Sequence, residues 1–172
     1  MADATIQTIL TNMQTLVNAE RITAGKLSFM KDLTDNRVDI TTNISDFDPQ
    51  FRYYSVVMGP RPDSIVEEIP KIGNRVQRIY ELLVICTLKV PKSKKWIFFS
   101  EPNDSKVPAG IEEFTNRVKD ILRNQTLSGV VNPVSGRQFV NDDLDDTDPY
   151  RHRHSFVYRV STLNTVTTSG VN

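Results

Sequence analysis

Apolar and polar side chains alternate over the longest distance in RVQRIYELLVICTLKV, residues 75–90. Successive side chains of an extended chain point to opposite faces of a sheet. One face of this strand is then apolar almost throughout, and the other is apolar at its middle and polar at both ends. Such a pattern is typical of a central strand, so we expect helices or a neighbouring subunit to cover the second face. The first face carries Val76, Arg78, Tyr80, Leu82, Val84, Cys86, Leu88 and Val90.

Two segments show the three- and four-residue spacing of an amphipathic helix. The first lies near the N-terminus, and the second is AGIEEFTNRVKDILRNQ, residues 109–125. Residues 51–58 and 152–164 are rich in aromatic and β-branched side chains and read as strands, and Val38 and Ile40 suggest a short additional strand. The apolar stripes are Ile6, Ile9, Leu10, Met13, Leu16 and Val17 in the first helix, and Ile111, Phe114, Val118, Ile121 and Leu122 in the second.

Two long excursions separate these elements, at residues 59–75 and 91–108. The first holds several prolines, which lack the backbone donor that a sheet requires, so we expect no strand within it. Together the elements predict an α+β fold, an antiparallel sheet of about four or more strands packed with two main helices. A chain of 172 residues fits a single domain, with a core over about 4–165 and a loose tail at 166–172.

Charge and cysteine content exclude several classes of protein. The 21 basic and 21 acidic side chains balance, which argues against a protein that coats DNA. The single cysteine, Cys86, cannot form an internal disulfide, and its apolar neighbours indicate a packed side chain rather than a nucleophile. Neither a secretory leader nor an apolar run long enough to cross a membrane is present, so we expect folding in a cytosol.

The sequence offers no strong catalytic, cofactor or metal motif. The run NDDLDDTDP, residues 141–149, lacks the glycine and the late glutamate of an EF-hand loop, so a solvated loop is expected. His152 and His154 share a strand face, without an evident third metal ligand. Walker, nucleophile-elbow and zinc-peptidase motifs are missing. We therefore expect a protein that is not an enzyme, with no cofactor and no bound metal.

The order of these segments resembles the tail terminator proteins of long-tailed bacteriophages, also called tail-completion or tail-to-head joining proteins. An N-terminal helix leads to SVVMGPRPDSI, then to RVQRIYELLVICTLKV, IEEFTNRVKDILRNQTLSG and HSFVYRVSTL. The resemblance spans roughly residues 4–165. It rests on the order of the elements and on the kinds of residue within them, because the family has no invariant catalytic motif. The segments at 27–50 and 91–108 are longer here than in the smallest members.

This resemblance implies a subunit of a homo-oligomeric ring, a hexamer in the family. The ring caps the tail tube, ends its polymerisation and offers a joining surface to the head. Implied partners are the tail tube protein, a head-completion or connector protein and, in a contractile tail, the sheath protein. DNA passes only as cargo, and no membrane takes part. The implied location is the neck of the virion, assembled in the bacterial cytoplasm.

Large apolar side chains in the two excursions are the candidate subunit contacts, because solvated loops seldom carry so many. The acidic run is a candidate channel wall. Another neck connector, or a nucleic-acid-binding module that uses the basic and aromatic segment 92–96, remains an alternative. The candidate contacts are Ile65, Val66, Ile69, Ile72, Trp96, Phe98 and Phe99, and the candidate channel residues are Asp142, Asp143, Asp145, Asp146 and Asp148.

Overall fold

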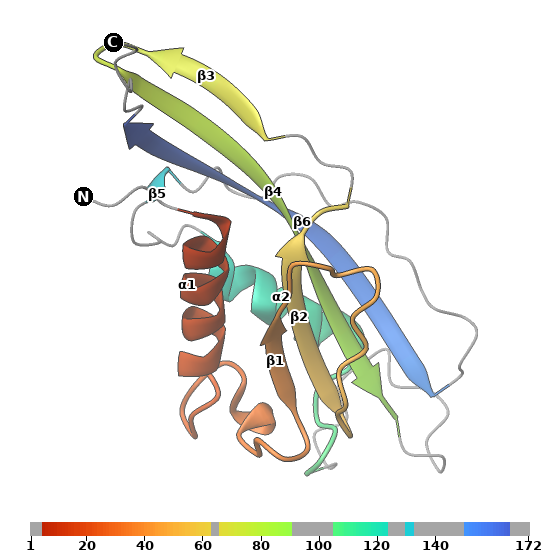
Figure 1. Ribbon diagram of the computed structural model, residues 1–172. Helices are drawn as coiled ribbons and strands as arrows, with labels where there is room; N and C mark the ends of the chain where they lie inside the picture. Colours follow the sequence, from red (N-terminus) through yellow and green to blue (C-terminus); the bar gives the residue numbers. More distant parts are fainter. Residues whose placement is uncertain (1–4, 63–65, 91–104, 124–129, 133–149, 166–172) are drawn as a thin grey trace.

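A computed structural model of the chain (Figure 1) confirms the α+β fold and describes residues 5–62, 66–90, 105–123, 130–132 and 150–165. Two helices and a six-stranded sheet form within these residues. A short 3-10 turn, η1, links the first helix to the first strand. In chain order the elements are α1 Ile6–Ala19, η1 Ser28–Met30, β1 Arg37–Ile40, β2 Tyr54–Pro60, β3 Glu67–Lys71, β4 Arg75–Lys89, α2 Ile111–Leu122, β5 Val130–Asn132 and β6 Arg151–Thr165.

The sheet is built around β4 and β6, which are 15 residues long each and pair antiparallel over their whole length. The strand order is β1-β2-β4-β6-β5. Because β6 occupies one edge of β4 throughout, β2 and β3 share the other edge, β2 along its C-terminal half and β3 along its N-terminal end. The expected central position of the strand at 75–90 is therefore correct.

Both helices lie on the same face of the sheet and enclose the main core with it (Figure 1). Two buried tyrosines connect the sheet to the second helix by hydrogen bonds as well as by apolar contact. The Tyr54 hydroxyl donates to the Ala109 carbonyl at 2.6 Å, and the Tyr158 hydroxyl donates to the Leu122 carbonyl at 2.8 Å. These bonds satisfy polar atoms that burial removes from water, and they hold both ends of α2 against the strands.

Two details differ from the sequence-based expectation. The excursion after β2 contains strand β3, in which Pro70 lies opposite Val76. In the described part of the chain β3 pairs with β4 alone, and an edge strand tolerates a residue without a backbone donor. In addition, β1 pairs with β2 in parallel, so the sheet is mixed rather than antiparallel throughout. The 13 residues between β1 and β2 allow the chain to return to the same end of the sheet.

The face of the sheet opposite the helices is covered over part of its area by the segment between β1 and β2. Ile44 of this segment packs with Val57 and Ile85 in a small second core. Gly59 of β2 makes the close approach possible, because a Cβ at this position would lie 2.6 Å from the Thr41 carbonyl oxygen. Neither helix covers this face. The loop between β1 and β2 therefore covers part of the strand face that we expected a helix or a neighbouring subunit to cover.

Candidate assembly surfaces

The N-terminal end of β4, with β3 and the C-terminal end of β6, forms a ribbon that extends beyond both helices (Figure 1). We call this ribbon, residues 67–79 and 161–165, the arm. It exists because β3 folds back on β4 through a three-residue turn, Ile72 to Asn74. Gly73 and Asn74 have φ values of 76° and 56° in this turn, a conformation that glycine and asparagine tolerate best.

Residues 71–75, at the end of the arm, are all exposed to solvent. We call them the tip. Ile72 is 98% exposed, the largest value among the exposed large apolar side chains of the described segments. Lys71 and Arg75 flank it, are exposed, and form no ion pair with a described residue. A single exposed isoleucine between two cations adds little to the stability of one copy.

The structure describes three of the seven apolar side chains that the sequence suggested as contacts. Val66, at the start of the arm, is 40% exposed; Ile69 is half-buried within β3; and Ile72 occupies the tip. These three residues follow one another along the arm, and the structure does not bring their side chains together: Val66 and Ile72 lie at opposite ends of β3. Ile65, Trp96, Phe98 and Phe99 lie outside the described residues, and so do Asp142, Asp143, Asp145, Asp146 and Asp148.

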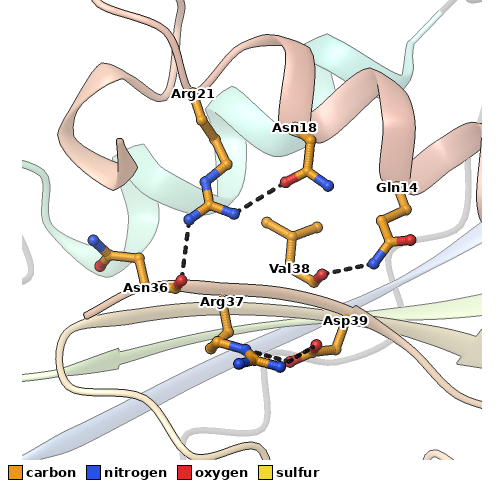
Figure 2. A network of polar contacts seen from close by, with 7 residues as sticks. All are labelled: Gln14, Asn18, Arg21, Asn36, Arg37, Val38 and Asp39. Carbon is orange, nitrogen blue, oxygen red and sulfur yellow. Dashed lines mark hydrogen bonds and ion pairs between the residues drawn. The ribbon is translucent and has the colours of Figure 1, made fainter. Parts of the chain in front are cut away.

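The free edge of β1, on the same side of β4 as β3, is closed by side chains of α1 and of the turn after it (Figure 2). The Gln14 Nε2 atom donates to the Val38 carbonyl at 2.8 Å, and the Arg21 Nη2 atom donates to the Asn36 carbonyl at 3.0 Å. The Val38 carbonyl lies in β1, and the Asn36 carbonyl belongs to the residue just before it. An unpaired strand edge invites pairing with another chain, and these two bonds block such pairing at β1.

Arg21 is the centre of this closure. Its guanidinium also donates to the Met30 carbonyl at 2.9 Å and to the Asn18 Oδ1 atom at 3.0 Å, although the residue is only 8% exposed. Burial, assisted by the nearby Arg37, lowers the pKa of the Arg21 guanidinium from its usual value. The side chain ties α1, η1 and β1 together, so its role is structural.

A groove of about 620 Å³ runs beside this network between α1 and β1, bordered by the exposed side chains Ile22 and Leu33. Gln14, Arg21 and Val38 are among the residues that line it; Gln14 donates to the Val38 carbonyl, and Arg21 donates to the acceptors named above. Arg37 is paired with Asp39 at 3.1 Å at its rim. These donors and acceptors are occupied within the chain, which does not favour a ligand here.

A shared ion pair marks the sheet face opposite the helices, where the arm begins. Glu81 of β4 accepts from Arg159 of β6 at 2.5 Å and from Arg61 at 2.8 Å. The hydrogen bond from Arg159 is the main cause that lowers the pKa of the Glu81 carboxyl; the bond from Arg61 adds to it, and burial opposes it. One carboxylate thus pairs with two guanidinium groups, which leaves a net charge of +1 on these three side chains, and it fixes β6 and the residue after β2 to β4.

Sequence reasoning missed one exposed apolar side chain at the other end of the sheet. Phe47 is 39% exposed and stands between Asp46 and Asp48, in the segment that connects β1 to β2. We call residues 46–48 the acidic loop. Asp48 pairs with Arg151 at the start of β6 at 3.3 Å, which fixes the loop near that end of the strand. The signal in the sequence was the triplet Asp-Phe-Asp followed by proline.

The remaining chemical candidates are placed inside the fold. Cys86 is fully buried beneath α2, and burial raises the pKa of its thiol to about 12, so the reactive thiolate is not formed near neutral pH. His154 is buried on the same face as Phe156, the face that packs on the helices. Among the described residues, no three histidine, cysteine or carboxylate side chains are grouped closely enough to hold a metal ion.

Comparisons with known proteins add no relative. No protein-family model matches the chain, and no curated protein matches it. In the segments that the structure describes, no helix has both the length and the apolar character needed to cross a membrane.

Proposed function

We propose that this chain is a structural subunit of a ring that ends a phage tail, in the manner of the tail terminator proteins it resembles in sequence. The ring caps the last layer of tail-tube subunits, stops their polymerisation and offers a joining surface to the head. The subunit performs no turnover. Its partners are further copies of itself, the tail tube protein, a head-completion or connector protein and, in a contractile tail, the sheath protein.

The observation that carries the proposal is the arm with its exposed tip. A 15-residue strand pair is much longer than the two helices require, and its free end extends beyond the core. A projecting ribbon with Ile72 at 98% exposure costs solubility and contributes little to the stability of one copy. In the proposed ring, contact with a neighbouring subunit removes the apolar surface of the tip from water.

The sheet edges support an assembly of defined geometry. A closed ring requires a head-to-tail contact between two different surfaces of the subunit. Here the free edge of β1 is capped by Gln14 and Arg21, whereas neither of the two described helices covers the tip of the arm (Figures 1 and 2). Uncontrolled edge pairing is thereby blocked at β1, and contacts through the arm are left available.

The test is made in the virus or prophage that encodes the chain. Deleting its gene should yield heads that are full but unattached, together with tail tubes of irregular length, and supplying the chain from a plasmid should restore joined particles. Joined particles with tails of normal length in the deletion strain would refute the proposal. Normal tails that remain unattached would favour the alternative of another neck connector, and altered DNA metabolism with normal particles would favour a nucleic-acid-binding module.

A further inference from the structure

Two exposed apolar side chains of the described segments are each flanked by two charged residues of the same sign. Ile72 at the tip stands between Lys71 and Arg75, and Phe47 in the acidic loop stands between Asp46 and Asp48. All four charged residues are exposed. The two surfaces are therefore complementary in charge and alike in having an apolar centre.

The acidic loop retains capacity to accept hydrogen bonds. The Asn43 amide donates to Asp46 Oδ2 at 2.7 Å, and Arg151 donates to Asp48 Oδ1 at 3.3 Å. The second oxygen of each carboxylate accepts no hydrogen bond from a described residue. Two carboxylate oxygens beside an exposed aromatic ring suit a partner that brings cations on either side of an apolar group.

The two surfaces cannot meet within one copy. Arg75 begins β4 at the tip, and the acidic loop is fixed by Asp48 to Arg151, which pairs with Lys89 at the far end of the same strand. At about 3.3 Å per residue, a strand of 15 residues separates the two by about 45 Å. Figure 1 shows the arm at one end of the sheet and the start of β6 at the other.

We propose that the tip of one copy docks on the acidic loop of the next, which forms the head-to-tail contact of the ring. This inference rests on the proposed function and names the two surfaces that meet. Ile72 packs on the Phe47 ring, while Lys71 and Arg75 pair with the carboxylates of Asp46 and Asp48. The surfaces lie at opposite ends of the subunit, so each copy uses both and the contact repeats around the ring.

Charge reversal at each surface tests the contact. The tip variant is Lys71→Glu with Arg75→Glu, and the loop variant is Asp46→Lys with Asp48→Lys. Each alone should raise the subunit concentration needed for half-maximal ring formation by at least about tenfold, because like charges then face each other. Combining all four changes in one chain restores opposite charges and should recover most of the assembly. Circular dichroism and thermal melting establish that each variant is folded.

Mixing the two variants gives a sharper result. The tip variant keeps an intact acidic loop, and the loop variant keeps an intact tip, so one productive contact forms between them. The two other surfaces of this pair are the reversed tip and the reversed loop, which again carry opposite charges, so a second complementary contact forms there and the two variants can alternate around a ring. Native mass spectrometry should therefore show monomers of each variant alone and, in the mixture, rings that contain equal numbers of the two variants; monomers only in the mixture would contradict the docking inference.

Controls separate this inference from the proposed function. Lys26→Glu and Ile22→Ser alter an exposed cation and an exposed apolar side chain outside both surfaces and should assemble normally. If the natural chain forms rings and the tip and loop variants form them equally well, the docking inference is wrong while the ring stands. If the natural chain stays monomeric at all concentrations tested, both the ring and the docking inference are wrong.

Discussion

Glu81 and Arg159 lie directly opposite each other on β4 and β6, and the Arg159 Nη2 atom donates to the Glu81 Oε1 atom at 2.5 Å. Arg61 shares the same carboxylate. The two bonds connect β4 to β6 and to the residue after β2, just before the arm begins. They also make this carboxylate a pH-sensitive element of stability, because they lower the pKa of Glu81.

The first prediction follows from that shift. A carboxyl whose pKa is lower in the folded chain stabilises it above the unfolded pKa, near 4.5, and loses this contribution as the pH falls through the folded pKa. Glu81→Gln should lower the free energy of unfolding at pH 7 by about 1–2 kcal/mol. The difference between the two proteins should shrink as the pH falls from about 6 to about 3. Urea unfolding at several pH values measures it, and a difference independent of pH would contradict the role assigned to Glu81.

A second prediction concerns the loop that covers the exposed face of the sheet. Gly59→Ala should lower the free energy of unfolding by about 1–3 kcal/mol, because the new Cβ would meet the Thr41 carbonyl at 2.6 Å. The loop would then move away, so truncating Ile44 to alanine should cost less in the Gly59→Ala background than in the natural chain. Equal costs in both backgrounds would show that the two residues are not coupled.

Arg21 and Arg37 form a matched pair for the third prediction. Arg21→Met removes hydrogen bonds from three acceptors of a buried network and should cost about 2–4 kcal/mol. Arg37→Met removes an ion pair in which the arginine side chain is 50% exposed and should cost at most about 1 kcal/mol. Because the Asn36 carbonyl becomes unpaired, Arg21→Met should also aggregate faster on mild heating. Similar stability losses in both variants would contradict the edge-closing role of Arg21.

Two buried threonines allow a fourth prediction. The Thr162 Oγ1 atom is buried without a hydrogen-bond partner among the described residues, whereas Thr115 Oγ1 donates to the Ile111 carbonyl at 2.7 Å. Thr162→Val preserves the shape and removes the unpaired hydroxyl, so it should leave the stability unchanged or raise it by up to about 1 kcal/mol. Thr115→Val should lower it by about 0.5–1.5 kcal/mol. A clear loss of stability in Thr162→Val would mean that its hydroxyl has a partner.

The sequence predicted those parts of the fold that periodicity determines. Alternation over residues 75–90 identified the central strand, and the spacing of Ile111, Phe114 and Val118 identified α2, because each pattern reflects one buried face. It did not predict β3, since Pro70 argues against a strand until its edge position is known. Nor did it predict the parallel β1–β2 pair, because four residues carry too little pattern to give a direction.

The candidate surface was predicted in part. Ile72 was identified because its loop carries more large apolar side chains than a solvated loop usually does, and the structure places it at the tip. Phe47 was missed because a single aromatic residue in a polar segment looks the same whether its ring is buried or exposed. Arg21 was missed for a related reason: its burial depends on carbonyl groups of residues 30 and 36, which no side-chain pattern reveals.

Native mass spectrometry of the purified chain over a range of concentrations tests the central claim most directly. We expect a closed ring of one defined size, a hexamer, that dissociates as salt rises from about 0.05 M to about 0.5 M, because charged side chains flank the apolar centre of each contact. Electron microscopy of the same sample should show rings with a central channel. A monomer at every concentration, or open chains of unlimited length, would contradict the claim.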